Sequence, residues 1–126
     1  MSQMSFLIDE HVTVALINAV VTDEPSIVIM QVGQPGMPPK GTLDPQLLEF
    51  AELNRMAIFT FDKSTMAVHA RSHTASGRHT FGVFVWTKEM FGIKEAAEEI
   101  VLLWSASEAE EWIDEVRYLP FPGHRN

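Results

Sequence analysis

Cysteine is absent from the 126-residue sequence, which excludes disulfide bonds and thiolate metal sites. No apolar run approaches the roughly 18 to 20 residues that a membrane-spanning helix needs. The N-terminus also lacks the basic flank and the longer apolar stretch of a secretion signal. From these absences we expect a cytoplasmic protein with no membrane segment.

Basic residues are scarce: nine lysines and arginines stand against 17 aspartates and glutamates, and the net charge is −8. Proteins that bind nucleic acid over a broad face are usually basic, because they neutralise phosphates. Any nucleic-acid contact must therefore be local or depend on bound cations. The apolar share of 46% is ordinary for a globular protein. We expect a single domain over residues 1–126, with a core from about 5 to 119 and a flexible tail over 120–126.

Short apolar runs alternate with helical patterns along the whole chain. The runs predict strands over about residues 5–9, 27–30, 57–62, 81–86 and 116–119. The helical patterns predict helices over about residues 11–21, 44–54, 63–70, 93–104 and 107–115. This alternation is typical of α/β proteins. We therefore expect a three-layer α/β/α fold with a mainly parallel central sheet and right-handed crossovers.

Local signals refine some of the helix boundaries. Asp44 is a natural N-cap, and Pro45 suits the first helical position. Ser107, with Glu110 three residues later, has the capping-box pattern. In the longest predicted helix, the spacing of apolar residues places Glu99 on the outward face.

Two of the predicted strands end on carboxylates. The first is followed by Asp9 and Glu10, and the third ends at Asp62. The carboxyl ends of parallel strands share one edge of a sheet, where open α/β folds bind ligands, and the helix beginning at Asp44 starts near that edge. Mg²⁺ or Mn²⁺ would relieve the repulsion among these acids and lower the pKa of a bound water. The alternative is that the acids only cap helices.

The segment FLIDEHV at residues 6–12 resembles the FLLDENLP opening of the small PIN-like proteins grouped as the DUF5615 family. DPQLLEFA at residues 44–51 and IFTFDK at 58–63 are similar to that family's D-x-x-I-L-x-x-A and V-L-V-T-x-D-x-D-F motifs. In order and spacing the match covers about residues 5–119. Each motif alone is weak, and the three in sequence are more specific.

This resemblance implies a PIN-like fold, in which many members are metal-dependent ribonucleases and some are toxins of toxin–antitoxin pairs. It places Asp9, Asp44 and Asp62 at the catalytic site as ligands of Mg²⁺ or Mn²⁺. Glu10 matches the family's acid beside the first aspartate and joins the metal site. Supporting roles at the site fall to Thr60, Lys63 and Ser64.

The sequence departs from the family pattern at several positions. Ser64 stands where the family usually has a second aspartate, so one candidate metal ligand is missing. His11 replaces the family's asparagine, and Thr13 replaces its proline. These changes bear on activity more than on fold, because loss of an acid weakens metal binding or marks a member that binds without cutting.

One concentrated basic stretch runs from His69 to His79, and its residues 71–79 follow the short third helix as a predicted loop. Its candidates for phosphate contacts are Arg71, His73, Arg78 and His79. The alternative, favoured because basic loops are common on protein surfaces, is a solvated loop without a ligand. The tryptophans lie in apolar patterns, so we expect core or interface rather than base-stacking positions for Trp86, Trp104 and Trp112.

Three functions compete at this point. The first is a metal-dependent ribonuclease that hydrolyses RNA phosphodiester bonds, acting as a toxin with an antitoxin protein as partner. The second is a catalytically weakened PIN-like module that acts through protein–protein binding. The third is a receiver-like domain that accepts a phosphoryl group on Asp62, with Thr87 and Lys88 nearby. We also expect the protein to form a homo-oligomer.

Overall fold

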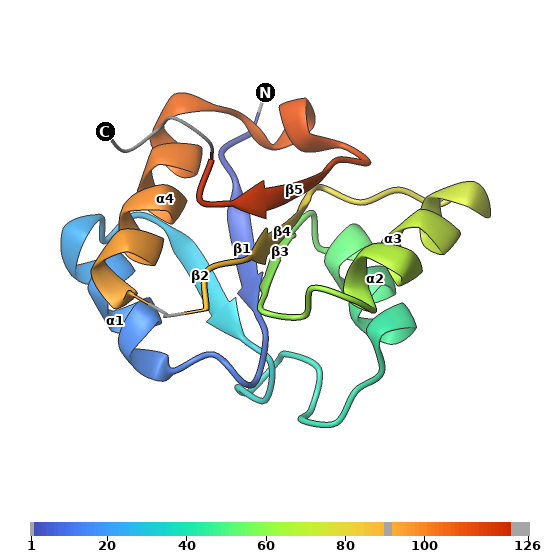
Figure 1. Cartoon of the computed structure of the whole chain (residues 1–126), viewed down its shortest axis with the longest axis horizontal. Coiled ribbons are helices and arrows are strands. Elements are labelled where there is room, and N and C mark those ends of the chain that lie inside the picture. The colour runs from blue at the N-terminus through green and yellow to red at the C-terminus, as the bar shows by residue number, and fades with distance from the viewer. Residues whose placement is uncertain (1, 90–91, 122–126) are drawn as a thin grey trace.

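The computed structural model describes residues 2–89 and 92–121, which form a sheet with helices on both faces (Figure 1). The strands are β1 (Ser5–Ile8), β2 (Val28–Gln31), β3 (Ala57–Thr60), β4 (Val83–Trp86) and β5 (Val116–Leu119). The helices are α1 (Val14–Asp23), α2 (Asp44–Leu53), α3 (Met66–Ala75), α4 (Ile93–Ala106) and the 3-10 helix η1 (Ala109–Trp112). The strands pair in the order β2-β1-β3-β4-β5, every pair parallel. The predicted three-layer α/β/α fold is confirmed.

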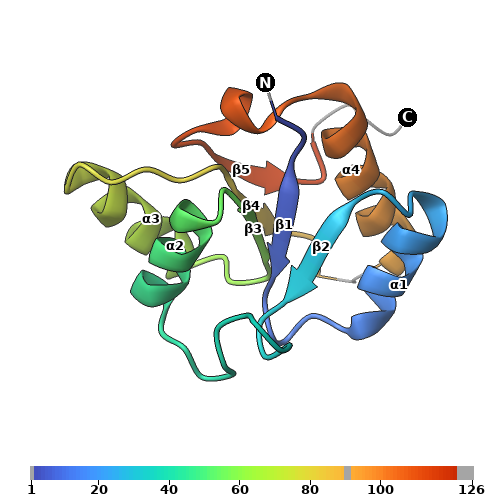
Figure 2. The ribbon, with the colours of Figure 1, turned by 180° about the vertical axis from the view of Figure 1, so that it is seen from behind.

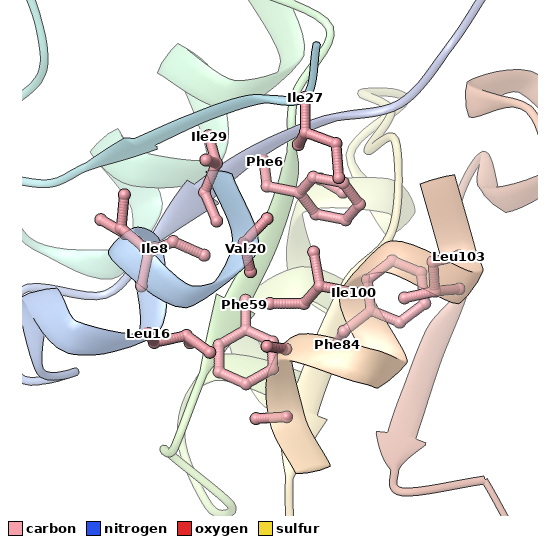
Figure 3. Packing of buried hydrophobic residues seen from close by; sticks show 14 of the residues in the cluster. Phe6, Ile8, Leu16, Val20, Ile27, Ile29, Phe59, Phe84, Ile100 and Leu103 are labelled. Carbon is pink, nitrogen blue, oxygen red and sulfur yellow. The ribbon is translucent and has the colours of Figure 1, made fainter. Parts of the chain in front are cut away.

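Side chains of the inner strands alternate between two hydrophobic cores, one on each face of the sheet. On one face, Phe6, Phe59 and Phe84 pack with α1 and α4 (Figure 3). On the other face, Leu7 and Ile58 pack with α2 and α3. Figure 2 shows the ribbon from behind. Burial on both faces explains why β3 and β4 are continuous apolar runs in the sequence. Within the described residues, no helix is both long and apolar enough to cross a membrane.

The connection through α4 has the opposite hand to the other three connections. Helices α1 and α4 pack on the same face of the sheet. The connection through α1 runs from β1 to β2, toward one edge of the sheet, and the connection through α4 runs from β4 to β5, toward the opposite edge. Four uniformly right-handed crossovers, as predicted, are therefore impossible. Because about 98% of such crossovers are right-handed, we assign the left hand to α4. On the edge strand β5, Tyr118 is 44% exposed.

Helix α3 extends into the basic stretch that the sequence predicted as a loop. It begins at Met66 rather than Lys63 and ends at Ala75, shortly before Gly77 adopts a positive φ of 91°. Such a backbone angle suits glycine and marks the end of a helix. The loop prediction is wrong for residues up to Ala75 because His73, a polar residue, is buried on the inward face of the helix.

The capping box after α4 lies one residue later than predicted. It joins Glu108 and Glu111 rather than Ser107 and Glu110, and it opens the short helix η1. The Ser107 hydroxyl instead donates to a carbonyl in the last turn of α4 at 2.6 Å and accepts a hydrogen bond from the Trp112 indole at 2.8 Å. Ser107 therefore lies at the C-cap of α4 and hydrogen-bonds to Trp112. The predicted helix to residue 115 stops at Trp112.

Glu99 is fully buried, although its spacing predicted an outward position. Its Oε1 accepts a hydrogen bond from the backbone N–H of Phe121 at 3.2 Å. The Phe121 ring stacks on Trp112, with ring centroids 6.2 Å apart. The chain after β5 thus folds back against α4, so the predicted flexible tail does not include Phe121. The rest of that tail, residues 122–126, lies outside the described residues.

Candidate functional site

An open cleft of about 460 Å³ lies at the carboxyl ends of β1 and β3. Its lining includes the four acids that the sequence singled out: Asp9, Glu10, Asp44 and Asp62. Strands β1 and β3 pair in parallel with Ile8 opposite Phe59, so the residues that follow them emerge at one edge. Connections from β1 and β3 leave in opposite directions across the sheet, and such a switch point is where open α/β sheets bind ligands.

Thr60, the last residue of β3, joins two of these acids. Its hydroxyl donates to Asp9 Oδ2 at 3.0 Å and accepts a hydrogen bond from the backbone N–H of Asp62 at 3.0 Å. Thr60 is only 1% exposed, so its rotamer is held by the surrounding core. It fixes the Asp9 carboxylate relative to the backbone of Asp62.

Asp62 organises the turn before α3. Its Oδ1 accepts hydrogen bonds from the backbone N–H groups of Ser64 at 3.0 Å and Thr65 at 2.9 Å, and the Thr65 hydroxyl donates to Oδ2. Burial opposes ionisation of this carboxyl, but the hydrogen bonds from Thr65 and Ser64 outweigh burial and lower the pKa of Asp62. Asp62 therefore has a capping role whether or not it binds a ligand.

Asp44 does not cap α2 as the sequence predicted. It is the first residue of the helix, and Leu43 holds the N-cap position without a side-chain cap. Asp44 Oδ2 instead lies 3.4 Å from the Thr65 hydroxyl, which can donate to it. Burial raises the pKa of Asp44, and the negative charges of Asp62 and, more weakly, Asp9 raise it further. The ionised form of Asp44 is thus disfavoured by burial and by its acidic neighbours. A cation in the cleft would offset the repulsion from those neighbours.

Glu10 ties the edge of the sheet to the long loop before α2. Its Oε1 accepts a hydrogen bond from the backbone N–H of Gly41 at 2.7 Å. Helix α1 begins at Val14, later than the predicted residue 11 or 12, because Thr13 serves as its N-cap. Asp9 and Glu10 therefore lie in a separate turn before the helix, where they line the cleft.

The oxygen donors of the cleft suit a hard divalent cation, since Mg²⁺ and Mn²⁺ prefer carboxylates and water. Burial, and after it the negative charges of Asp62 and Asp9, raise the pKa of Asp44, so a cation would relieve the part of the shift that comes from repulsion. Within residues 2–89 and 92–121, however, no three carboxylate or imidazole groups are arranged to hold one metal ion. Thr65 hydrogen-bonds to both Asp44 and Asp62. The acids fit a cation by their chemistry, and Asp62 must exchange its Thr65 hydroxyl contact to bind one.

Neutralising two neighbouring acids of the cleft is expected to have opposite effects on stability. Asp44→Asn should stabilise the fold at neutral pH, because a raised pKa means that the folded state disfavours the ionised carboxyl. Asp62→Asn should destabilise it by about 1 kcal/mol, because the hydrogen bonds that Asp62 accepts are weakened without the charge. Urea unfolding of both variants measures the two free energies.

The pH dependence of this effect follows from the lowered pKa of Asp62. Its contribution is present above the ordinary value of 3.8 and is lost as the pH falls through the lower pKa of the folded state. Asp62→Asn and the parent protein should therefore converge in stability in strong acid. Equal destabilisation by both substitutions at neutral pH would contradict the account of Asp44.

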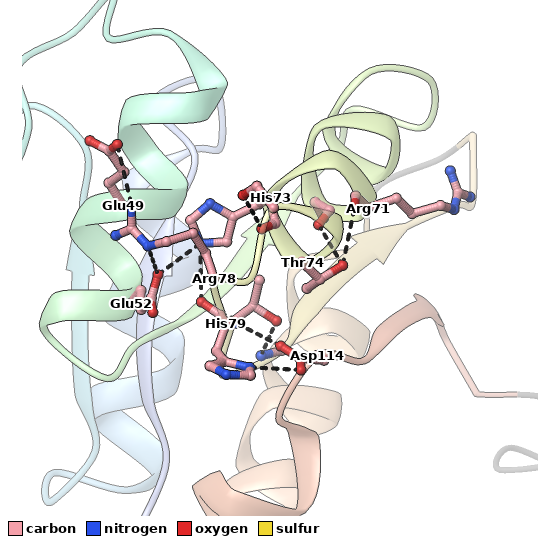
Figure 4. A network of polar contacts seen from close by, with 12 residues as sticks. Glu49, Glu52, Arg71, His73, Thr74, Arg78, His79 and Asp114 are labelled. Atoms are coloured by element: carbon pink, nitrogen blue, oxygen red, sulfur yellow. Dashed lines mark hydrogen bonds and ion pairs between the residues drawn. The ribbon is translucent and has the colours of Figure 1, made fainter.

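Three of the four residues predicted to contact nucleic acid form ion pairs with acids on neighbouring segments (Figure 4). None of these residues lines the acidic cleft. His73 Nε2 lies 2.9 Å from Glu52 Oε1, and Arg78 Nε donates to the same oxygen at 3.0 Å. His79 Nδ1 lies 2.9 Å from Asp114 Oδ2. The structure does not bring these side chains to the acids of the cleft. The fourth predicted residue is exposed on α3: Arg71.

Removing the carboxylate of Glu52 is expected to destabilise the fold by about 1–3 kcal/mol, because the buried His73 ring loses an acceptor. Burial opposes ionisation of Glu52, but hydrogen bonds from the His79 backbone and the His73 ring lower its pKa. Glu49→Ala is the matched control: Glu49 lies 3.6 Å from Arg78 in an exposed pair, and such pairs contribute about 0–1 kcal/mol. Urea unfolding at neutral pH compares Glu52→Ala with Glu49→Ala, and equal effects would contradict the buried network.

The receiver-like interpretation needs a hydroxyl and a lysine directed at Asp62. The Thr87 hydroxyl donates to the Leu119 carbonyl at 2.9 Å, and Lys88 Nζ lies 2.8 Å from Glu95 Oε2. Both side chains are therefore engaged with β5 and α4. Labelling of Asp62 by acetyl phosphate is the observation that this interpretation would require.

Two residues of the cleft region were missed by the sequence analysis. Thr65 contacts two of the acids, and no sequence pattern distinguishes it from any other hydroxyl residue before a helix. Phe61 lines both the acidic cleft and a second pocket beside it. The sequence did contain a sign of the position of Phe61. An aromatic residue between Thr60 and Asp62 lies at the end of its strand rather than in the strand interior.

Comparisons of the chain with protein-family models, with curated proteins and with solved structures gave no match. The PIN-like resemblance therefore stays a prediction based on three sequence motifs. The acidic cleft and its contacts are the basis for a functional proposal.

Proposed function

We propose that this protein is a Mg²⁺- or Mn²⁺-dependent ribonuclease that hydrolyses RNA phosphodiester bonds at the acidic cleft. The proposal rests on one observation, that three carboxylates from separate segments line the same cleft: Asp9, Asp44 and Asp62. The charges of Asp62 and Asp9 add to the effect of burial in raising the pKa of Asp44, and a bound cation would relieve that repulsion. The resemblance to PIN-like ribonucleases supports the same residues.

The residues of the cleft would have distinct roles in this reaction. A divalent cation held there would polarise the scissile phosphate and lower the pKa of water. Asp9 and Asp62 would hold the cation, with Thr60 keeping the Asp9 carboxylate in place. Asp44, the third acid lining the cleft, is the candidate to accept a proton from water. The water oxygen bonds to phosphorus, one P–O ester bond breaks, and the leaving alkoxide takes up a proton.

The direct test is to incubate the purified protein with mixed single-stranded RNAs and Mn²⁺. We expect cleavage that stops when EDTA removes the cation. Cleavage that continues in EDTA, or its absence at millimolar Mn²⁺ across varied RNA sequences, would count against the proposal. The matched variants that assign the residues are described in the Discussion.

A second candidate function is a PIN-like interaction module without catalysis. Two observations favour it: Ser64 stands where the family has an acid, and hydrogen bonds from Ser64 and Thr65 already occupy Asp62. Calorimetry separates the two functions. Heat of Mn²⁺ binding at millimolar concentration supports the ribonuclease, whereas no such heat together with a stable dimer or hetero-complex supports the module.

The expected setting of the ribonuclease also belongs to this proposal. We propose a cytoplasmic protein whose substrate is RNA and whose partners are an antitoxin protein and further copies of the same chain. Co-purification of a tightly bound second protein that inhibits cleavage would support the antitoxin, and light scattering would give the number of copies.

A further inference from the structure

The two edge strands of the sheet differ in how their outward backbone groups are used. The sheet ends at β2 on one side and at β5 on the other (Figure 1). At the β2 edge, the Gln34 side chain accepts a hydrogen bond from the backbone N–H of Gln31, and the Gln34 N–H donates to the Gln31 carbonyl at 3.1 Å. A turn thus occupies the outward groups of the last residue of β2. Covering an edge in this way hinders pairing with a strand of another chain.

The β5 edge keeps its outward backbone groups unpaired. The carbonyl groups of Glu115 and Leu119 accept hydrogen bonds from β4 and the residue that follows it, at 2.9 and 2.8 Å. Because the backbone groups of successive residues alternate sides along a strand, the N–H and C=O of Val116 and Tyr118 point away from β4. Among the described residues, none hydrogen-bonds to these outward groups. Strand β5 is therefore a short open template for another strand.

The side chains of β5 differ between the two faces of the strand. Val116 is partly buried against the core beneath α2 and α3, and Tyr118 lies on the same face and is 44% exposed. Arg117 lies on the opposite face, with its Cζ 5.4 Å from the centroid of the Trp112 ring. Its Nη2 is 2.7 Å from Glu115 Oε1. One face of the edge is thus aliphatic and aromatic, and the other carries one acid and one base in exposed positions.

We propose that a second copy of this chain adds its own β5 antiparallel to this strand, across a twofold axis at Val116. In that register the outward N–H and C=O of Val116 pair with those of the same residue in the second copy. Glu115 of each copy then lies opposite Arg117 of the other, and opposite charges that face each other across strands are stabilising. Two five-stranded sheets become one continuous sheet.

Charge and backbone chemistry select this register. An axis at Arg117 would place the two guanidinium groups directly opposite each other, which is destabilising. An axis at Tyr118 would place Val116 opposite Pro120, which has no N–H to donate. A twofold interface is closed, and the turn at Gln31 covers the end of the other edge strand. We therefore expect a dimer rather than a longer assembly.

This dimer specifies the self-association with further copies of the chain, and in that respect it rests on the proposed function. It does not depend on RNA cleavage, because none of the β5 residues lines the acidic cleft. Measurements of association therefore test the dimer, and measurements of cleavage test the ribonuclease.

The first test uses single-cysteine variants, which are unambiguous because the chain contains no cysteine. Val116→Cys should form an interchain disulfide under mild oxidation, since paired residues of antiparallel strands have Cα atoms about 5.5 Å apart, within the usual range for a disulfide. Val28→Cys is the matched control, because Val28 is 54% exposed on the opposite edge strand. We expect non-reducing gels to show a cross-linked dimer for Val116→Cys and not for Val28→Cys.

The second test exchanges charges across the interface. Arg117→Glu and Glu115→Arg each place like charges opposite each other in a homodimer, so each should raise the dimer dissociation constant at least about tenfold. When the two variants are mixed, acids of one chain face bases of the other, and a heterodimer should form. Sedimentation velocity over the micromolar range measures the parent, each variant and the mixture. The ion pair within one chain cannot produce association of the mixture.

The outcomes decide the dimer separately from the ribonuclease. A parent protein that stays monomeric, equal cross-linking of the two cysteine variants, or a mixture of charge variants that does not associate would each overturn the dimer. Mn²⁺-dependent cleavage by a monomer would overturn the dimer alone, and a dimer without cleavage would overturn the ribonuclease alone. Thermal melts followed by circular dichroism check that each variant is folded. Val116→Cys changes little volume and keeps the test decisive if a charge variant unfolds.

Discussion

Asp9→Asn is expected to reduce Mn²⁺-dependent RNA cleavage at least about 100-fold, because loss of a residue that only supports a metal ligand already costs about 10–100-fold. Asparagine matches aspartate in shape and can still accept the hydrogen bond from the Thr60 hydroxyl, which lies 3.0 Å from Asp9 Oδ2. The fold should therefore persist, and the loss should report the missing charge at the cleft. The measurement is the initial rate of cleavage across a range of Mn²⁺ concentrations.

The matched control for this substitution is Asp23→Asn, which removes the same charge from an exposed residue at the end of α1. It should leave the cleavage rate within about twofold of the parent, as expected for a surface change away from the site. Asp62→Asn should resemble Asp9→Asn in activity while also lowering stability. Cleavage that survives both Asp9→Asn and Asp62→Asn would show that the nuclease activity does not arise at this cleft.

Phe59→Ala is expected to destabilise the protein by about 3–5 kcal/mol, the usual cost of truncating a buried aromatic ring. Phe59 is completely buried at the centre of the sheet (Figure 3). Its ring lies between those of Phe61 and Trp86 in the chain of aromatic contacts, with both centroids at 6.3 Å. The substitution leaves a cavity beneath the strand that carries Thr60. Urea unfolding followed by circular dichroism gives the change in the free energy of unfolding.

Leu53→Ala is the control for this prediction, since Leu53 is an apolar residue that is 78% exposed at the end of α2. Its truncation should change the free energy of unfolding by no more than about 0.5 kcal/mol. A loss below about 1 kcal/mol for Phe59→Ala would mean that the central core is not packed as described. A large loss for both variants would point to an additional surface contact at Leu53.

The fold was largely predictable because its sheet is buried on both faces. A strand such as Phe84 and its neighbours in β4 must then be apolar at every position, and the helices between such strands show their inward spacing in the sequence. The junctions of β1 and β3 with the acids that follow them could be located for the same reason. These features depend on residues close together in the chain.

The features that the sequence could not predict depend on distant contacts. The burial of Glu99 depends on the backbone of Phe121, which returns across α4. The face on which α4 packs, and hence the hand of its crossover, is not encoded by the amphipathic pattern of the helix itself. His73 could not be recognised as buried without Glu52, which lies on a neighbouring helix.

The candidate site was predictable in location and not in detail. Strand ends predicted that Asp9 and Asp62 would share an edge, and both line the same cleft. The sequence assigned Asp44 to helix capping or metal binding, and the capping role is wrong because Leu43 takes the N-cap position. Thr65, which contacts both Asp44 and Asp62, was not predicted, because its role depends on α2 and α3 approaching each other.

The most direct test of the central claim is a crystal of the protein soaked in Mn²⁺ and measured at a wavelength where manganese scatters anomalously. The proposed function predicts one strong anomalous peak in the acidic cleft, within ligand distance of carboxylate oxygens from Asp9 and Asp62, and the Thr65 hydroxyl displaced from Asp62. A cleft without an anomalous peak at millimolar Mn²⁺, with the Thr65 contact intact, would contradict a metal-dependent active site at this edge of the sheet.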